Sequence, residues 1–504
     1  MACCGYKPVR MFTGLSFSEQ KLVSVRLPIA GDSHTSPMPL QYLSSGALVL
    51  GGTHGALAVV RSLGRQGIPV WLISNGQPLA KFSRYTSRSF PWPGPDHPEA
   101  LGWLLNLARE HRLYGWTLFP AADADARLVS LQHAELSKVF RLTTPPWDVT
   151  QWAFDKRLTY QRAASLGINV PWSYYPRGRQ DVAQFECHFP LILKPTMRQG
   201  ENAFTAAKAW KVDGRDALLS RYDEAATLVG NGAIVIQELI PGSGSTQFSY
   251  AGVWNRGEPV ASLVALRVRQ FPIDFGWTST YVQTIENKEV EDAACRLLRS
   301  LNYDGLVEIE FKYDQRDACY KILDINVRAW TWIALGEIAG TDFPLLAWRL
   351  ARGESVPSSA GIPGARWMHL SRDVVAACQE MIAGTLSPVD YVRSLQAPLT
   401  FAAFANDDVV PGILDIPVGT WRVLARRLPS MGRIISQKAP DRLVLHNHTE
   451  GAGSNGYKTN APLDVAHLDD AELSARMAQL DAEISALKQL IESPQINDSK
   501  TKVA

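Results

Sequence analysis

Two neighbouring segments of the chain carry oxygen-bearing side chains at alternate positions, as strands with one polar face do. The first segment contributes Glu308 and Glu310, and the second contributes Asp324, Asn326 and Arg328. The polar cluster between them predicts a hairpin that sets Glu310 opposite Asp324 and Glu308 opposite Asn326. Facing carboxylates repel unless a cation lies between them, and a hard ion with oxygen ligands, Mg²⁺ above all, suits this set. The alternative is a solvated face of an antiparallel hairpin.

Two lysines earlier in the chain predict contacts to an anion. Lys156 lies in the first turn of an amphipathic helix, and Lys194 ends the apolar strand 189–195. The loop 196–200 adds backbone donors and a further cation, a combination typical of phosphate sites. A lysine that ends an apolar strand can also extend into solvent, which is the alternative for Lys194.

Two further strands end in polar groups that could bind a ligand. Gln237, Glu238, Leu239 and Ile240 close an apolar strand that a Pro-Gly pair then breaks. Their backbone groups could meet the edge of a flat heterocycle or could simply satisfy the strand end. Arg267 and Arg269 are predicted to share one face of strand 265–270 without an acidic residue alternating between them. Such a pair favours an anion, unless both side chains are solvated.

The elements that precede these segments alternate between strand and helix. A strand at 46–50, the sequence GGTHG, a helix at 56–66 and a strand at 69–73 predict a βαβ unit. A helix at 98–111, a strand at 117–120 and a helix at 126–137 continue the alternation to a boundary near residue 150. The glycines do not form GxGxxG, and the second strand ends in Ser74 and Asn75 rather than in an acid. Nicotinamide nucleotide binding is therefore not expected.

Composition sets further bounds on the class of protein. The chain has 504 residues, 46% of them apolar and 20% charged, which suits about three globular domains. A formal net charge of +2 gives no electrostatic footprint for nucleic acid or a membrane surface. Six scattered cysteines fit a reducing compartment, although the adjacent Cys3 and Cys4 could be a lipidation or metal site. No apolar run suits a signal peptide or a membrane span, so a cytoplasmic protein is expected.

The two ends of the chain differ in composition from the middle. Residues 1–45 are expected to be a mostly disordered leader, with an organelle transit peptide as the alternative. Residues 356–446 are expected to form an accessory region, and 447–462 a polar linker. In the final segment, 463–504, apolar residues at 473–491 follow heptad spacing and predict a short coiled-coil helix before a disordered tail. This seam would form a homodimer or dock on the protein's own surface.

The ordered set of motifs resembles the ATP-grasp superfamily. Within 46–350, the stretches GGTHGALAVVRSLGRQGIPV, LILKP, QELIPG, RQFPIDFG and LDINVR look like predicted carboxylate–amine ligases related to D-aspartate ligase. The resemblance implies an α/β protein, with α+β character in the ATP-grasp part. A Rossmann-like domain at 46–150 would precede a two-subdomain ATP-grasp fold at 151–355, and a helical tail would follow.

The resemblance also implies a role for each site residue. Lys156 and Lys194 would contact the phosphates of ATP, and Gln237, Glu238, Leu239 and Ile240 would face the adenine, largely through backbone groups. Glu310, Asp324 and Asn326 would hold Mg²⁺, with Mn²⁺ as an alternative, while Arg328 and either Arg267 or Arg269 would act in catalysis. Two departures from the family pattern are an Asp at 324, where Glu is commoner, and a glycine-poor loop after Lys194.

The implied reaction joins a small-molecule carboxylate to an amine. Such enzymes phosphorylate the carboxylate with ATP, and the amine then displaces phosphate from the acyl phosphate. Two other readings stay open: a carboxylase-like or thiol-ligating ATP-grasp enzyme, and a nucleotide-binding scaffold that oligomerises through its C-terminal helix. The identity of the substrates is not encoded in any recognisable pocket motif.

Overall fold

The computed structural model describes residues 45–417, except 77–78, 198–201, 208, 274–277 and 397. The predicted leader up to residue 44, the linker at 447–462 and the heptad seam at 473–491 lie outside the described residues. None of the helices within the described ranges combines the length and the apolar character that crossing a membrane requires.

The N-terminal part is a five-stranded parallel sheet in the order β3-β2-β1-β4-β5. Its strands are β1 (Ala47–Leu50), β2 (Val70–Ser74), β3 (Thr86–Pro91), β4 (Thr117–Pro120) and β5 (Arg141–Leu142). The helical segments are α1 (His54–Arg65), η1 (Leu79–Phe82), α2 (Ala100–His111), α3 (Asp123–Leu131) and α4 (His133–Leu136). The central strands are continuously apolar because both faces of a parallel sheet are covered. The predicted Rossmann-like alternation is confirmed.

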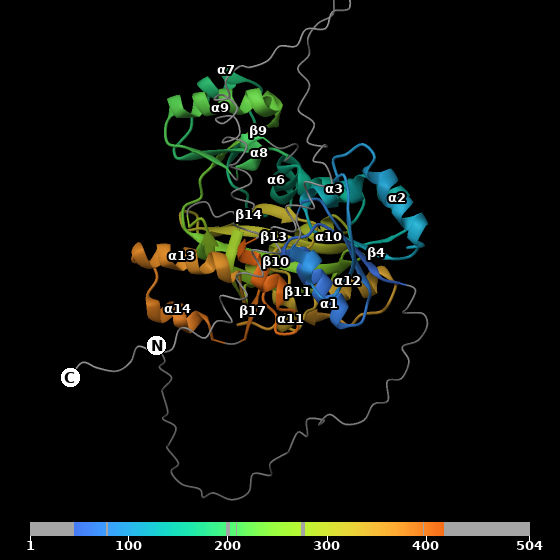
Figure 1. Cartoon of the computed structure of the whole chain (residues 1–504). Helices are drawn as coiled ribbons and strands as arrows, with labels where there is room; N and C mark the ends of the chain where they lie inside the picture. Colours follow the sequence, from blue (N-terminus) through green and yellow to red (C-terminus); the bar gives the residue numbers. More distant parts are fainter. Residues whose placement is uncertain are drawn as a thin grey trace, which may run out of the picture. The chain divides into compact units, whose positions relative to one another are not determined.

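A small four-stranded antiparallel sheet follows in the order β6-β9-β7-β8. Its strands are β6 (Ser173–Tyr174), β7 (Leu191–Pro195), β8 (Trp210–Val212) and β9 (Ile234–Glu238). Helices α5 (Trp147–Phe154) and α6 (Lys156–Ser165) precede this sheet in the chain. The segments between its strands contain α7 (Arg179–Gln184), α8 (Ala203–Ala206), α9 (Arg215–Val229) and η2 (Asn231–Ala233). Apolar residues of α7 and α9 pack with this sheet in one core, and both helices lie beside it in Figure 1.

The third sheet has eight strands and is mostly antiparallel. Its main path is β14-β13-β10-β11-β12-β16-β17, and β15 pairs with β11. The strands are β10 (Gln247–Asn255), β11 (Glu258–Phe271), β12 (Thr278–Ile285), β13 (Gly305–Asp314), β14 (Cys319–Asn326), β15 (Ser359–Ala360), β16 (Arg366–Met368) and β17 (Leu399–Phe401), with η3 (Gly244–Thr246) before β10. Helix α10 (Lys288–Ser300) buries its apolar side together with Ile309 and Phe311. Because side chains alternate, Glu308 and Glu310 take the other face of β13.

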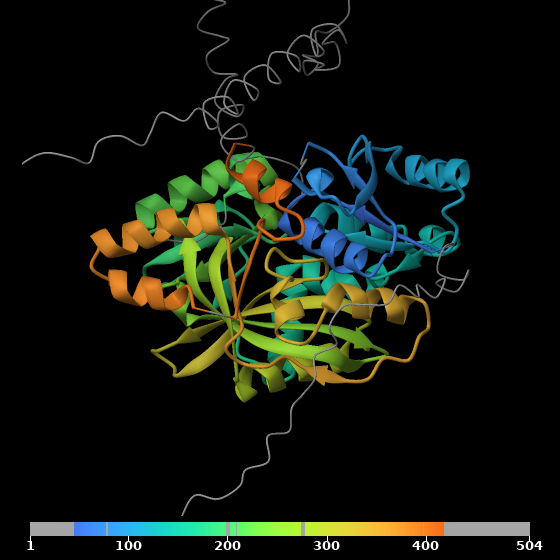
Figure 2. The same cartoon turned by 60° about the horizontal axis from the view of Figure 1, so that its bottom comes forward.

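The region after residue 355 is more than an accessory layer, because two of its strands extend the third sheet. β16 pairs with β12, and β17 pairs with β16. Helices α11 (Leu335–Ile338) and α12 (Phe343–Ala351) precede this region, and α13 (Leu370–Ile382) and α14 (Pro388–Ser394) lie within it. Figure 2 shows α13 and α14, in orange, beside the strands of the third sheet.

Helix α1 packs directly against the chain that leaves the predicted metal hairpin. A Cβ at Gly55 would lie 2.8 Å from the carbonyl oxygen of Ala329, so only glycine allows this approach. The amide of Ala329 donates to the carbonyl of Pro120 at the end of β4. The carboxyl end of the parallel sheet therefore lies next to the end of β14.

Candidate active site

The β13–β14 hairpin has the predicted register. Glu310 pairs with Asp324 and Glu308 pairs with Asn326. A bulge directly after Glu310 shifts the rest of the ladder by one residue, so that Asp314 pairs with Cys319 at the turn. The four predicted oxygen-bearing side chains thus occupy opposed positions on two adjacent strands.

Cationic and amide groups surround these carboxylates. Glu310 accepts hydrogen bonds from Gln247 Nε2 at 2.6 Å and from the Arg267 guanidinium at 3.2 Å. Lys156 Nζ lies 2.8 Å from Asp324 Oδ1. Lys156 is the first residue of α6, and the Asp155 side chain caps that helix. The first predicted phosphate contact and the hairpin therefore belong to one charged cluster.

Asn326 and Arg328 link the hairpin to the first domain. Asn326 donates to Glu308 Oε2 at 2.7 Å, and its oxygen accepts from Arg328 at 3.1 Å. Arg328 also donates to Asp123 Oδ1 at 2.5 Å, at the first residue of α3. Asp123 thereby orients the arginine that the sequence assigned to catalysis.

The donor set fits Mg²⁺. Carboxylate and amide oxygens on facing strands are the ligand types that this ion takes. Burial, followed by the charge of Glu310, raises the pKa of Glu308 to about 7. Glu310, Asp324 and Asn326 are the residues that would hold the ion.

A cleft of about 330 Å³ lies between the small sheet and the third sheet. Its size is in the range of small-ligand sites. Its lining includes residues of the small sheet, of the strand-end segment and of the third sheet: Lys194, Gln237, Leu239, Ile240, Gln247 and Lys312. The cleft brings together the predicted phosphate lysine and the predicted adenine segment.

A hydrogen-bond chain holds the two polar groups of the small sheet. Lys194 Nζ donates to Gln237 Oε1 at 2.9 Å. Gln237 Nε2 donates to the Tyr160 hydroxyl at 3.1 Å and to Ser173 Oγ at 3.0 Å, and Tyr160 donates to the Leu323 carbonyl. This chain fixes Lys194 relative to β14.

The Glu238 side chain is committed to structure. It accepts from Lys321 Nζ at 2.9 Å, from Arg316 at 2.6 Å and from the backbone amide of Trp172 at 2.9 Å. The backbone amide of Glu238 donates to the Trp172 carbonyl at 3.0 Å, so the contact of this residue with adenine stays a prediction.

Arg267 and Arg269 carry their guanidinium groups to different partners. Arg267 reaches Glu310 and Gln247 in the candidate site. Arg269, 3% exposed, forms two hydrogen bonds to Asp373 on α13, at 2.9 and 2.8 Å, and stacks on Tyr281. The β11–β12 register is irregular between the two arginines, as expected where a bulge redirects side chains. The expectation of two arginines sharing one anion without acidic partners was wrong, because each has a carboxylate partner distant in sequence.

Sequence reasoning missed several residues of the site. Gln247 and Lys312 line the cleft, and burial, followed by the charge of Arg267, lowers the pKa of Lys312 to about 8. Lys312 continues the alternation of Glu308 and Glu310, so strand periodicity could have identified it. Asp123 carried no such signal, because only the tertiary contact with Arg328 gives it a role.

The buried Asp125 on α3 is expected to make the free energy of unfolding of the protein depend on pH. It is 4% exposed, and burial, followed by the charge of Asp123, raises its pKa to about 7. The pKa of an Asp side chain in the unfolded chain is about 3.9. The stability that protonated Asp125 contributes to the fold is therefore complete below pH ~4 and is lost as the pH rises through about 7. We expect Asp125→Asn to raise the free energy of unfolding at about pH 8 by ~2–4 kcal/mol relative to wild type.

Urea unfolding at about pH 5 and about pH 8 measures this difference. Asp213→Asn, which alters only an exposed ion pair with Lys211, is the control and should have little effect. Equal pH dependence in wild type and Asp125→Asn would contradict the assignment.

Comparisons with known proteins indicate the class of protein. Residues 278–359, which include the hairpin, match the family described as carbamoyl-phosphate synthase L chain, ATP binding domain. The D-aspartate ligase of Enterococcus faecium is 23% identical over 254 residues, 47% of this chain and 59% of that protein. The chain thus matches less than two thirds of that relative's length.

Solved structures show a similar fold. The biotin carboxylase domain of Hydrogenobacter thermophilus 2-oxoglutarate carboxylase, solved with MgADP, ADP and bicarbonate, is 15% identical with a TM-score of 0.51, covering 62% of this chain and 71% of that one. An L-amino acid ligase from Bacillus licheniformis is 15% identical with a TM-score of 0.48, covering 61% and 74%.

The chain is similar to the ATP-grasp superfamily, through the ATP-binding domain model at residues 278–359 and through a distant likeness to D-aspartate ligase.

Proposed function

We propose that this protein is an ATP- and Mg²⁺-dependent ligase that joins a small-molecule carboxylate to an amine. One observation carries the proposal: the opposed Glu310 and Asp324 are flanked by Arg267 and Lys156, and Gln247, which donates to Glu310, lines the same cleft as Lys194. A site of this composition suits the transfer of a phosphoryl group between two anions. Similarity to D-aspartate ligase supports an amine as the acceptor.

In the first step, a carboxylate oxygen attacks the γ-phosphorus of ATP, and the bond to the β,γ-bridging oxygen breaks to release ADP. Lys156, Lys194 and Arg267 would bind the phosphates and reduce the repulsion between the reacting anions. Bound Mg²⁺ would neutralise further phosphate charge and help to align the oxygens.

In the second step, the amine nitrogen attacks the acyl carbon, phosphate leaves, and the nitrogen loses a proton. Arg328, held by Asp123 and Asn326, would donate to the oxyanion of the tetrahedral intermediate. The Asp123 carboxylate and the Asn326 amide hold the Arg328 guanidinium in one orientation before the substrate binds.

Hydroxylamine trapping tests the proposal. The protein is incubated with ATP, Mg²⁺, pooled amino acids and hydroxylamine, which converts an acyl phosphate to a hydroxamate. We expect hydroxamate that forms only with a carboxylic acid present, and an amount of ADP equal to the sum of the hydroxamate and the amide product. ADP release driven by bicarbonate alone would instead support a carboxylase, and binding of ATP without turnover would support a scaffold.

Lys194→Met is expected to weaken ATP binding by about 10–100-fold, because it removes a charge-assisted contact to phosphate worth ~1.5–3 kcal/mol. Isothermal titration with ATP and Mg²⁺ measures the dissociation constant. Lys211→Met, on the adjacent strand β8, removes an exposed lysine of the same sheet and is the matched control. Equal ATP affinity in the Lys194 and Lys211 variants would contradict the role of Lys194.

A further inference from the structure

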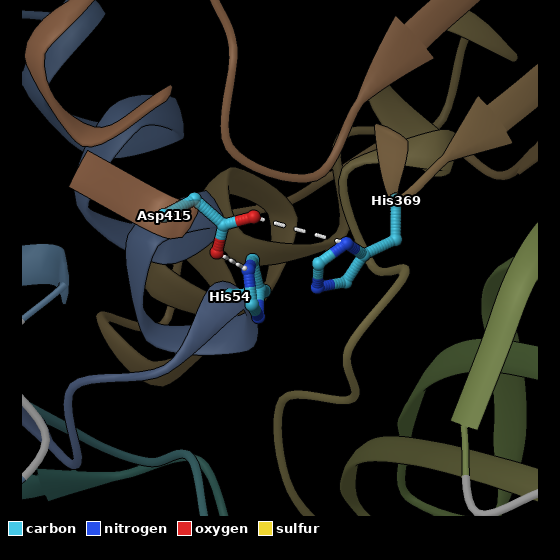
Figure 3. Close-up of side chains that lie close together, drawn as sticks. All are labelled: His54, His369 and Asp415. Atoms are coloured by element: carbon cyan, nitrogen blue, oxygen red, sulfur yellow. Dashed lines mark hydrogen bonds and ion pairs between the residues drawn. The ribbon is translucent and has the colours of Figure 1, made fainter. Parts of the chain in front are cut away.

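A second group of potential metal ligands lies outside the candidate active site. His54, His369 and Asp415 each offer one ligand atom, and these atoms lie within 4.8 Å of one another (Figure 3). His54 is the first residue of α1, His369 follows β16, and Asp415 lies in the helical residues 410–417. Three segments distant in sequence thus converge on one point.

The spacing of the ligand atoms is close to that of a metal site. His54 Nε2 lies 2.8 Å from Asp415 Oδ1, and His369 Nδ1 lies 3.8 Å from Asp415 Oδ2. In a tetrahedral site with bonds of about 2.0–2.1 Å, neighbouring ligand atoms are separated by about 3.3 Å. The observed distances bracket this value, so small side-chain shifts would complete the site.

His369 supplies a second, independent indication. It is 2% exposed, and its Nε2 has no hydrogen-bond partner within the described ranges. A buried imidazole nitrogen without a partner costs free energy, and Nε2, rather than the Nδ1 that lies near Asp415, is the nitrogen that a bound ion would satisfy. The ring faces His54 at a centroid distance of 4.4 Å, so a shared ion could use this imidazole.

Asp415 is oriented by a group outside the ligand set. Ser371 Oγ donates to Asp415 Oδ2 at 2.9 Å and lies 3.2 Å from His369 Nδ1. Hydrogen bonds of this kind fix the ligand side chains in metal sites. The arrangement therefore contains ligands and an element that supports them.

The face of α1 that carries His54 also binds residues 407 and 408, which precede the helical residues 410–417. His54, Arg61 and Arg65 lie seven and four residues apart, on one side of the helix. Arg61 pairs with the buried Asp408 at 2.9 Å, and Arg65 pairs with Asp407 at 2.8 Å. The His54–Asp415 contact extends this row to the helical residues 410–417.

We propose that His54, His369 and Asp415 bind one divalent transition-metal ion of the Zn²⁺ class, and that this ion fixes residues 410–417 on α1. Two imidazoles with one carboxylate favour such an ion over Mg²⁺, which prefers oxygen ligands. The site is separate from the hairpin cluster in its residues and in its metal preference.

The experiment uses the full-length chain, stripped of metal with a chelator and then titrated with Co²⁺ in excess Mg²⁺. We expect one Co²⁺ per chain, with the visible d–d absorption of a low-coordinate N/O site, and displacement by Zn²⁺. Zn²⁺ should also raise the melting temperature. His54→Gln and Asp415→Asn should each weaken binding by about 100-fold or more, since losing a supporting residue alone costs about 10–100-fold.

His133→Gln, at a partly exposed histidine on α4, is the matched control and should bind Co²⁺ as wild type does. Glu310→Gln should also retain Co²⁺ binding, which separates this site from the hairpin. Circular dichroism verifies that each variant is folded. Absence of Co²⁺ and Zn²⁺ binding at micromolar concentrations, or equal binding in His54→Gln and wild type, would overturn the proposal and leave a hydrogen-bonded clamp only.

Discussion

Asp324→Asn and Glu310→Gln are each expected to reduce ADP release by about 10²–10³-fold, the scale of losing one group that stabilises transition-state charge. Each substitution keeps the shape of the side chain but removes a charge from the facing pair of β13 and β14. The remaining amide oxygens are weaker ligands for Mg²⁺. Steady-state rates at saturating ATP and substrates measure the effect.

Asp324→Asn should leave the melting temperature close to that of wild type, because Asp324 is partly exposed and ion pairs of exposed groups contribute little to stability. Glu310→Gln removes the charge partner of the buried Arg267, so we expect a lower melting temperature in a protein that still folds. Glu289→Gln, an exposed change on α10, controls for loss of a carboxylate elsewhere. Wild-type turnover in either hairpin variant would remove the metal assignment.

Arg267→Met and Arg269→Met are expected to fail in different ways. Arg269→Met leaves Asp373 buried without its partner, which typically costs about 3–5 kcal/mol of stability. Arg267→Met should instead lower turnover by about 10²-fold, because Arg267 contacts Glu310 at the site. Urea unfolding and steady-state kinetics, measured on both variants, separate the two effects.

A double variant gives the control for the buried pair. Arg269→Met combined with Asp373→Leu removes both charges and should recover part of the stability lost by Arg269→Met alone. The opposite pattern, in which Arg269→Met abolishes turnover in a fully stable protein, would transfer the catalytic assignment from Arg267 to Arg269.

The hairpin could be predicted from sequence because its information is local. Alternation fixes which side chains share a face, and a short connection fixes which positions pair. The register of Glu310 with Asp324 follows from these two facts. The bulge after Glu310 leaves no comparable signal, because it depends on how the strand twists within the sheet.

Partners distant in sequence account for what was missed. Arg269 and Asp373 are 104 residues apart, and nothing near Arg269 indicates that its charge is already satisfied. His54 and Asp415 are 361 residues apart, and the sequence GGTHG drew attention to its glycines rather than to its histidine. β16 and β17 are three residues each, too short for a periodic pattern to reveal their place in the third sheet.

The contact at Gly55 has a consequence for how nucleotide enters. The backbone of Gly55 contacts the Ala329 carbonyl, and Arg328 forms an ion pair with Asp123. These contacts join the parallel sheet and the hairpin into one rigid unit, which forms the floor of the site. The small sheet reaches that floor through hydrogen bonds and ion pairs such as those of Glu238 with Lys321 and of Gln237 with Tyr160. Hydrogen bonds and ion pairs of this kind can break and re-form in water, whereas two closely packed backbone segments cannot move past each other. Hinge movement that admits ATP is therefore expected in β6-β9-β7-β8, with the floor held still.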